Sequence, residues 1–126
     1  MLPVLDGMRH LAALSARFGE DRVLGGVAFV MTTLDADGDI RRPADLRPFT
    51  YGARSGADPE RLGAVHEALS GAGFDTVLSS DILGQMWAKW VVIASMSAVA
   101  TLMRGTIGEV ADQPGGIGFA TAVVAE

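Results

Sequence analysis

The sequence predicts a mixed α/β (α+β) fold, in which short strands and helices precede one long helix. Apolar residues recur at intervals of three and four over residues 8–18 and again after Pro59, which is typical of amphipathic helices. The segments between them are rich in Val, Phe and Thr and are bounded by Gly, Pro and Asp, which is typical of short strands. From residue 82 onward, an apolar segment long enough for six turns indicates the long helix.

The composition indicates a folded chain of limited size. The 126 residues fit one domain and exclude two complete ones. Hydrophobic residues make up 49% of the sequence and charged residues 20%, which excludes disorder for the bulk of the chain. The sequence therefore predicts a packed scaffold on which a site can be built.

The first segment, residues 2–7, is predicted to be the apolar end of a strand followed by a turn. Asp6 and Gly7 form this turn, and Asp6 is a candidate N-cap for the next helix. That helix covers residues 8–18 and ends at Gly19, which supplies a left-handed stop.

Residues 23–34 are predicted to form strand structure, in which the glycines at 25–26 suit a bulge or a close backbone approach. The next segment, residues 35–39 (DADGD), indicates a hairpin turn at Asp-Gly. Its alternating aspartates resemble a calcium loop superficially, but Gly38 is fourth where an EF-hand has its glycine sixth, and Leu46 stands twelfth where the loop needs a bidentate glutamate. We therefore interpret the segment as a solvated turn.

The second half of the chain contains the clearest helix signals. The remaining predicted elements are strands over 40–42, 49–53 and 74–78, a helix from Pro59 to a stop at Gly73 with Asp58 as its N-cap, and a long helix over 82–103 capped by Ser80 and Asp81. Beyond it, glycines break the pattern until helical character resumes near the end. GGIG at 115–118 follows a helix and a proline loop instead of a strand, so we interpret it as a flexible connector and not as a nucleotide-binding loop.

Charge and residue types exclude several function classes. Fifteen acidic and ten basic residues give a net charge of -5, so nucleic acid is not an expected partner. The chain has no cysteine, which removes disulfides and thiolate chemistry, and we assume a cytoplasmic location. The longest uncharged run, residues 90–103, is shorter than the ~20 residues of a membrane span, so membrane insertion is disfavoured. No G-x-S-x-G elbow supports a hydrolase.

Lys89 is the strongest candidate for chemistry, because it is the only lysine in the sequence and the only charged residue of the long helix. Such a lysine either extends to water or lies in a pocket where it becomes a usable proton donor. On the same helical row, at four-residue steps, lie Gln85, Ile93, Ser97 and Thr101. A cleft along this row is therefore one hypothesis, and a structural lysine is the other.

The other candidate side chains have simpler interpretations. Trp87 and Trp90 flank Lys89, and we interpret them as core or interface anchors more readily than as substrate stackers. His10 and His66 lie on different predicted helices without a second ligand at metal-binding spacing, so we expect both to face solvent and expect no metal site.

Three segments in order, LPVLDGM, VLGGVAFV and DILGQMWAKW, resemble the middle portion of the ketopantoate reductase (2-dehydropantoate 2-reductase) family. The most specific match is the stretch from Asp81 to Lys89, which ends in a W-x-K motif. The resemblance implies that residues 1–78 are the C-terminal part of a Rossmann-like NADP-binding domain. Residues 79–126 would begin a helical substrate and dimerisation domain, incomplete in this chain.

The resemblance also implies the function. Members of this family are NADP-dependent oxidoreductases that reduce a 2-oxo acid to a 2-hydroxy acid, namely ketopantoate to pantoate in pantothenate biosynthesis. Lys89 would be the general acid, and Asp6 and Gly7 would lie at the cofactor, with Asp6 where the family has asparagine. Ile93 and Ser97 stand where the family has substrate-binding asparagines, which leaves a related 2-oxo acid or ketone open as substrate.

The family's glycine-rich fingerprint for NADP would precede Met1, so we expect this chain to be an internal fragment without turnover of its own. Its expected partner is a small-molecule 2-oxo acid, and a homodimer is left open. The alternative function is a non-catalytic interaction or dimerisation module, in which the apolar helix over residues 87–103 pairs with another chain.

Overall fold

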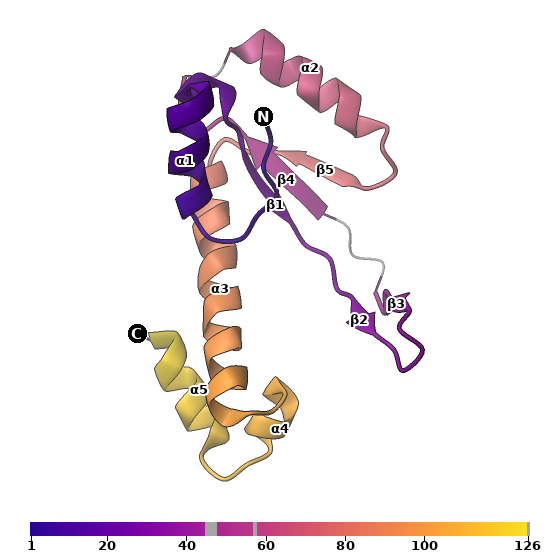
Figure 1. Cartoon of the computed structure of the whole chain (residues 1–126), viewed down its shortest axis with the longest axis vertical. Coiled ribbons are helices and arrows are strands. Elements are labelled where there is room, and N and C mark those ends of the chain that lie inside the picture. Colours follow the sequence, from indigo (N-terminus) through magenta and orange to yellow (C-terminus); the bar gives the residue numbers. More distant parts are fainter. Residues whose placement is uncertain (45–47, 57, 126) are drawn as a thin grey trace. The chain divides into compact units, whose positions relative to one another are not determined.

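The computed structural model describes residues 1–44, 48–56 and 58–125 (Figure 1). They form two compact units, Met1–Met86 and Trp87–Glu126, and the helix α3 (Ile82–Met103) runs from the first into the second. Strands lie in the first unit, whereas the second consists of helices and their connections. The predicted mixed α/β class is therefore confirmed.

A three-stranded sheet organises the first unit. Its strand order is β1 (Gly25–Ala28), β4 (Pro48–Gly52) and β5 (Asp75–Leu78). β1 pairs with β4 antiparallel, and β4 pairs with β5 parallel. Because parallel neighbours need a crossover connection, the chain forms helix α2 (Pro59–Ser70) between β4 and β5. The predicted strands over 49–53 and 74–78 are confirmed within one residue at each end.

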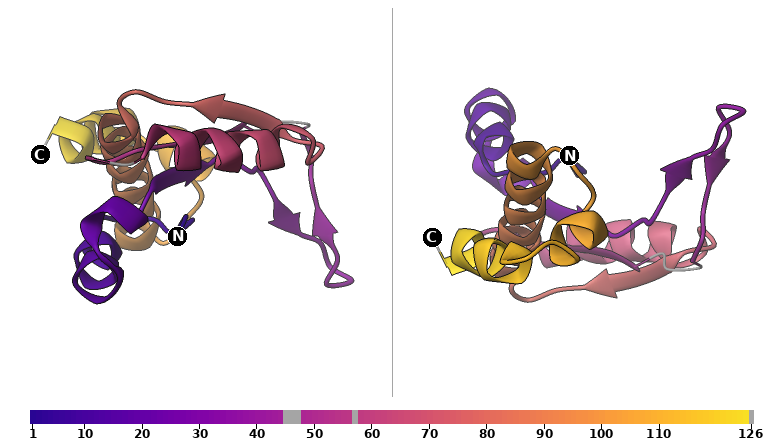
Figure 2. Two further views of the ribbon diagram at one scale, coloured as in Figure 1. Left: turned by 90° about the horizontal axis from the view of Figure 1, so that it is seen from above. Right: turned by 90° about the horizontal axis from the view of Figure 1, so that it is seen from below.

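The DADGD segment forms the predicted hairpin, which joins β2 (Thr33–Leu34) to β3 (Ile40–Arg41) and extends away from the three-stranded sheet (Figure 2). One carboxylate oxygen of Asp35 accepts hydrogen bonds from the backbone N–H groups of Asp37 and Asp39, at 3.0 and 2.9 Å. The guanidinium of Arg41 donates to the other oxygen, and these contacts hold the pKa of Asp35 below its ordinary value.

The strand predicted over residues 23–34 is shorter than expected, because pairing with β4 stops at Ala28 and resumes in the hairpin only at Thr33. Residues 2–5 form no strand either. The carbonyl of Met1 accepts a hydrogen bond from the Leu24 N–H at 2.9 Å, so this segment lies beside the start of β1 without a regular ladder.

Two of the three predicted helix caps are confirmed. The Asp58 carboxylate accepts from the Glu60 N–H at 3.0 Å and Pro59 begins α2, while Asp81 Oδ1 accepts from the Gly84 N–H at 3.0 Å at the start of α3. The third, Asp6, is wrong: the N-cap of α1 (Arg9–Phe18) is Met8, which makes no side-chain cap bond. The chain turns at Gly7 (φ 78°), so Asp6 lies two residues before the cap position. α2 also ends earlier than the predicted stop at Gly73.

The core of the first unit lies where α1, β1 and the first turn of α3 meet. Its buried members are Leu11, Val23, Val27, Ile82 and Met86. Two glycines make the contact with α3 possible. A Cβ atom on Gly25 would lie 2.8 Å from Ile82 Cγ1, and one on Gly52 would lie 2.3 Å from the Ser79 carbonyl oxygen. The close approach predicted at residues 25–26 is therefore confirmed.

The second unit contains the rest of α3, α4 (Ile107–Ala111) and α5 (Gly116–Ala125). Sequence reasoning missed α4, which begins with a capping box in which Thr106 and Glu109 bond each other's backbone N–H groups. The interpretation of residues 115–118 as a flexible connector is wrong from Gly116 onward. A Cβ atom on Gly116 would lie 1.7 Å from the Val110 carbonyl oxygen, so this glycine packs the start of α5 against α4.

Gly52→Ala should lower the free energy of unfolding by about 1–3 kcal/mol, because the added methyl group overlaps the Ser79 backbone. Gly63→Ala is the matched control. Gly63 lies inside α2 with nothing within 4 Å of its added Cβ, so this variant should gain up to about 1 kcal/mol through helix propensity. Chemical denaturation measures both, and equal stability of the two variants would contradict the close contact.

Candidate active site on helix α3

Lys89 is the only charged residue among the 22 of α3, as the sequence indicated. The helix is apolar on all sides, and several large side chains on it are solvent-exposed, including Trp87 (53% exposed) and Met96 (51% exposed). Lys89 itself is half-buried. A single ammonium group on such a surface is the one place in α3 where a polar molecule finds a full charge.

The row that continues from Lys89 follows the helix at four-residue steps. Ile93 lies one turn on and is half-buried, and Ser97 lies two turns on and is exposed. At 1.5 Å per residue these positions are about 6 and about 12 Å along the axis from Lys89. The three predicted site residues of the second unit therefore share one face of α3.

Another face of α3 packs against the two following helices. Val91, Val92, Ser95, Met96 and Val99 line a groove of about 220 Å³ together with Ile107, Ala120 and Val124 from α4 and α5. On a helical wheel, these α3 positions are centred about 130° from the row of Lys89, Ile93 and Ser97, but Met96 lies only about 20° from Lys89. The groove therefore borders the lysine row on the same helix.

Asp6 and Gly7, the predicted cofactor residues, belong to the first unit. They form a bend before α1, in which Asp6 is exposed and Gly7 has a φ of 78°. Only glycine adopts this conformation without steric cost, and it leaves the backbone open to close approach. Lys89, Ile93 and Ser97 belong to the second unit.

The predictions for the aromatic and histidine side chains are corrected in part. Trp87 and Trp90 are both exposed in this structure, which contradicts the core interpretation and leaves the interface and substrate-stacking interpretations open. The predicted solvent-facing histidines are wrong. His66 Nδ1 lies 2.7 Å from the hydroxyl of Tyr51, a fully buried residue of β4, and His10 Nε2 is buried.

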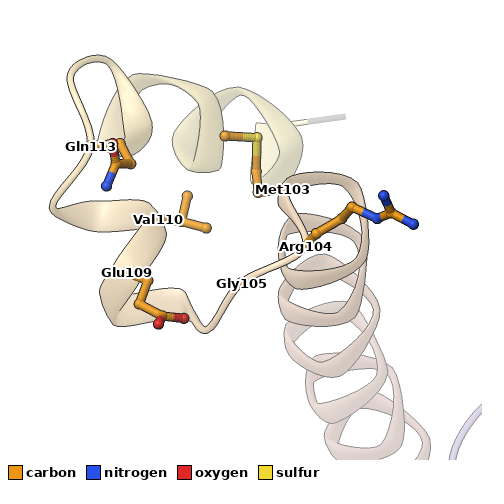
Figure 3. A pocket seen from close by; sticks show the side chains of 6 residues that line it. All are labelled: Met103, Arg104, Gly105, Glu109, Val110 and Gln113. Atoms are coloured by element: carbon orange, nitrogen blue, oxygen red, sulfur yellow. The ribbon is translucent and has the colours of Figure 1, made fainter.

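A second pocket, of about 320 Å³, lies where α3 ends and α4 begins (Figure 3). Arg104 ends α3 with a φ of 54°, and the Gly105 N–H donates to the Ala100 carbonyl at 3.2 Å. The side chain of Arg104 points away from Glu109 and Gln113, which also line the pocket. The polar groups therefore do not converge on one ligand position. The Thr106–Glu109 capping box was the sequence signal for this region.

The described residues also bear on metal binding and on membrane crossing. Within residues 1–44, 48–56 and 58–125, no three His, Asp or Glu side chains are grouped as a metal ion would require. In the same part of the chain, α3 is the one helix with the length and composition to cross a membrane, a test that core helices of soluble domains also pass. α3 is longer than the uncharged run of residues 90–103 because the helix also includes Lys89 and the residues before it.

The helical segment that carries Lys89 matches a known family. Residues 81–126 fit the family described as "Ketopantoate reductase PanE/ApbA C terminal". This segment belongs to the ketopantoate reductase family. The match includes the W-x-K motif and all of α3, so the resemblance of the sequence to this family is confirmed.

Two curated relatives extend the similarity beyond this segment. The chain is 31% identical over 126 residues to "Uncharacterized oxidoreductase YkpB" of Bacillus subtilis, covering all of this chain and 42% of that protein. It is 28% identical over 114 residues to a 2-dehydropantoate 2-reductase of Mesorhizobium japonicum, covering 90% of this chain and 35% of that protein. The chain thus spans about two fifths of the length of these relatives.

Solved structures share the fold. A 2-dehydropantoate 2-reductase from Geobacter metallireducens superposes with a TM-score of 0.80 at 19% identity, over 98% of this chain and 41% of that one. A D-mandelate dehydrogenase in complex with NADH superposes with a TM-score of 0.75 at 15% identity, over 98% and 41%. The ketopantoate reductase fold therefore occurs in reductases and dehydrogenases of the kind that use nicotinamide cofactors.

The capping box gives a pH-dependent prediction. The backbone N–H and hydroxyl of Thr106 donate to Glu109 and hold the pKa of its carboxyl below the ordinary value of 4.5. Because the folded-state pKa is depressed, the cap stabilises α4 fully above pH 4.5 and is lost as the pH falls through the folded-state pKa.

Carbonyl ¹³C NMR titration of Glu109 checks this directly. Thr106→Val removes the hydroxyl donor and keeps the backbone N–H, so it should move the titration midpoint part of the way up toward 4.5. Thr101→Val, the same substitution at an exposed position of α3, should leave the midpoint in place. An unchanged midpoint in Thr106→Val would contradict the hydroxyl bond of the capping box.

Proposed function

We propose that the protein containing this chain is an NADP-dependent oxidoreductase that reduces a 2-oxo acid to a 2-hydroxy acid, as in the conversion of ketopantoate to pantoate in pantothenate biosynthesis. One observation carries the proposal. The segment that matches the ketopantoate reductase family presents a single charged side chain on α3, and that side chain is a lysine. Because the chain spans about two fifths of its curated relatives, the activity is proposed for the full-length protein.

Lys89 has the chemistry that this reaction needs from a protein group. Hydride addition to a keto carbon leaves negative charge on the oxygen, and an ammonium group stabilises that charge and can transfer a proton to it. Bound NADPH supplies the hydride. In this proposal Lys89 Nζ gives its proton to the keto oxygen, and the product is the 2-hydroxy acid. The interaction strengthens when the bound substrate and the rest of the protein exclude water from the apolar surface around Lys89.

The bend at Asp6 and Gly7 fits one part of a nicotinamide cofactor. The carboxylate of Asp6 accepts hydrogen bonds, and the carboxamide of nicotinamide offers an NH₂ donor. Gly7, with its positive φ and no side chain, allows a flat ring to approach the backbone. A carboxylate does not suit the cofactor phosphates, so we assign Asp6 to the nicotinamide end. We also propose a cytoplasmic location, consistent with the absence of cysteine.

Replacing Lys89 tests the proposal in the full-length protein. Lys89→Met keeps most of the apolar stem and removes the charge, so turnover should fall by about 10²–10⁴-fold. NADPH affinity, measured by fluorescence titration, should stay nearly unchanged. Thr121→Val, at an exposed position of α5 and away from this row, is the control and should keep full activity. Equal turnover of Lys89→Met and the unmodified protein would refute the role of Lys89.

The exposed apolar side chains of α3 favour the second candidate function, a non-catalytic helical interaction or dimerisation module. Trp87, Val92 and Met96 are each about half exposed. Side chains of this size gathered on one helix are typical of surfaces that another chain covers.

Analytical ultracentrifugation of this chain tests the second candidate. A pairing helix predicts a concentration-dependent increase in sedimentation coefficient, and Trp87→Glu should abolish it by placing a charge on the contact surface. Val30→Glu, which changes an exposed apolar residue of the first unit, is the control and should leave self-association intact. A monodisperse monomer at all concentrations would contradict pairing of two copies.

A further inference from the structure

Helix α2 is attached to the rest of the first unit by little buried surface and one specific bond. No residue of α2 is fully buried. Within the described residues, the contact of the Tyr51 hydroxyl with His66 Nδ1, at 2.7 Å, is the only hydrogen bond from an α2 side chain to another element. The two rings lie 6.0 Å apart between their centroids. A helix with so few buried contacts depends strongly on such a bond.

The burial of Tyr51 determines the direction of this hydrogen bond. Tyr51 is 0% exposed, and its hydroxyl has no second partner in the part of the chain that the structure describes. If Nδ1 carried a hydrogen, the phenolic hydrogen would be buried without an acceptor, which is costly. We therefore assign the hydroxyl as donor and Nδ1 as acceptor, which places the hydrogen of a neutral His66 on Nε2.

A proton added to His66 reverses this bond. Both ring nitrogens of a charged imidazole are donors, so Nδ1 then donates to the Tyr51 oxygen. The phenolic hydrogen loses its acceptor inside the protein and pays the desolvation cost of an unpaired donor. His66 is half-buried, so its ring still exchanges protons with the solvent.

On α2 itself, no charged side chain shares the row of His66. The positions three and four residues away are Leu62, Gly63, Leu69 and Ser70, none of which is ionisable. The ionisable residues of the helix lie on other rows, namely Glu60, Arg61 and Glu67.

The strands packed against α2 offer no nearby counter-charge either. β4 has no ionisable residue besides Tyr51. On β5, which contacts α2, the ionisable residue is Asp75. It lies about 10 Å along the strand from Leu78, the residue that pairs with Tyr51.

The remaining charged neighbours are engaged elsewhere. Asp21 and Arg22, of the 3₁₀ turn η1 (Glu20–Arg22), line a pocket of about 110 Å³ with residues of α2 that precede His66. Beyond β4, the Arg54 guanidinium donates to the Ser15 hydroxyl at 2.8 Å. No described carboxylate is therefore positioned to compensate a charged His66.

We propose that Tyr51 and His66 form a pH-sensitive switch, which holds α2 on the sheet while His66 is neutral and loosens α2 when His66 is protonated. This inference does not depend on the proposed reductase activity. The Tyr51 carbonyl also accepts a hydrogen bond from the Ser79 N–H at 2.8 Å, two residues before the Asp81 cap of α3. Tyr51 thus contacts α2 through its side chain and the start of α3 through its backbone.

Hydrogen–deuterium exchange of the full-length protein, measured by mass spectrometry, tests the switch. Conversion of the rates to protection factors removes the intrinsic pH dependence of amide exchange. Between about pH 8 and pH 5, where imidazole gains its proton, the protection of α2 should fall by about tenfold, as expected for one buried hydroxyl that loses its partner. Protection in β1 and β4 should change less.

Three variants separate this pair from other effects of acid. His66→Asn keeps an acceptor near the Nδ1 position and does not titrate, and Tyr51→Phe removes the hydroxyl. Both should make the protection of α2 independent of pH. His10→Asn is the matched control, because it removes the other histidine of this sequence, and it should keep the pH dependence.

Two results for the unmodified protein would overturn the inference without reference to any variant. One is constant protection of α2 over this pH range. The other is an equal loss of protection in α2, β1 and β4, because acid would then weaken the whole unit. A pH dependence that persists in His66→Asn would overturn it as well.

Discussion

The contact between the sheet and the first turn of α3 is the constraint on which the first unit depends. Ile82 and Met86 are buried directly against Gly25, and Ile82 also lies against Gly52, at positions where a side chain on either strand would overlap them. Two glycines on neighbouring strands thus create the space that the helix fills. The Asp81 cap fixes the start of α3 at the same place. The helix that carries the candidate lysine therefore begins at a point defined by backbone contact.

The burial of α3 changes along its length. Its first residues are core residues, whereas those beyond Met86 belong to the second unit and are largely exposed. An apolar helix normally obtains its stability from burial, because propensity alone supports long helices poorly in water. Here α4 and α5 cover one face of α3, and Lys89 lies on another. The Lys89 charge would be screened less once another part of the protein or a bound molecule excludes water from this surface.

Sequence reasoning predicted the elements whose ends carry specific side chains. Asp58 with Pro59, and Asp81, gave the correct starts of two helices because their carboxylates have only the first-turn N–H groups to accept from. The prediction of Asp6 as an N-cap was wrong because a positive φ at Gly7 redirects the chain before the helix begins. α4 was missed because glycines on both sides hide its Thr106–Glu109 box. His66 was misjudged because its partner, Tyr51, comes from a distant strand.

The candidate site, like the fold, could be predicted only in part from the sequence. A single charge on an apolar helix is visible in the sequence, and so is the row that follows Lys89. The face of α3 that forms the groove with α4 and α5 is not visible in the sequence, because it depends on where the later helices pack. The glycine-rich segment after α3 gave no indication of where those helices would pack.

The C-terminal end of α3 combines an unfavourable backbone conformation with a favourable charge. Arg104 occupies the left-handed position that glycine usually takes at a helix end, although the chain has 16 glycines and the next residue is one of them. A side chain there is strained, but its positive charge is favoured near the negative end of the helix dipole. The conformational cost does not depend on dissolved ions, whereas the electrostatic gain is screened by them. Ionic strength therefore acts on this junction through the charge of Arg104 and not through its backbone conformation.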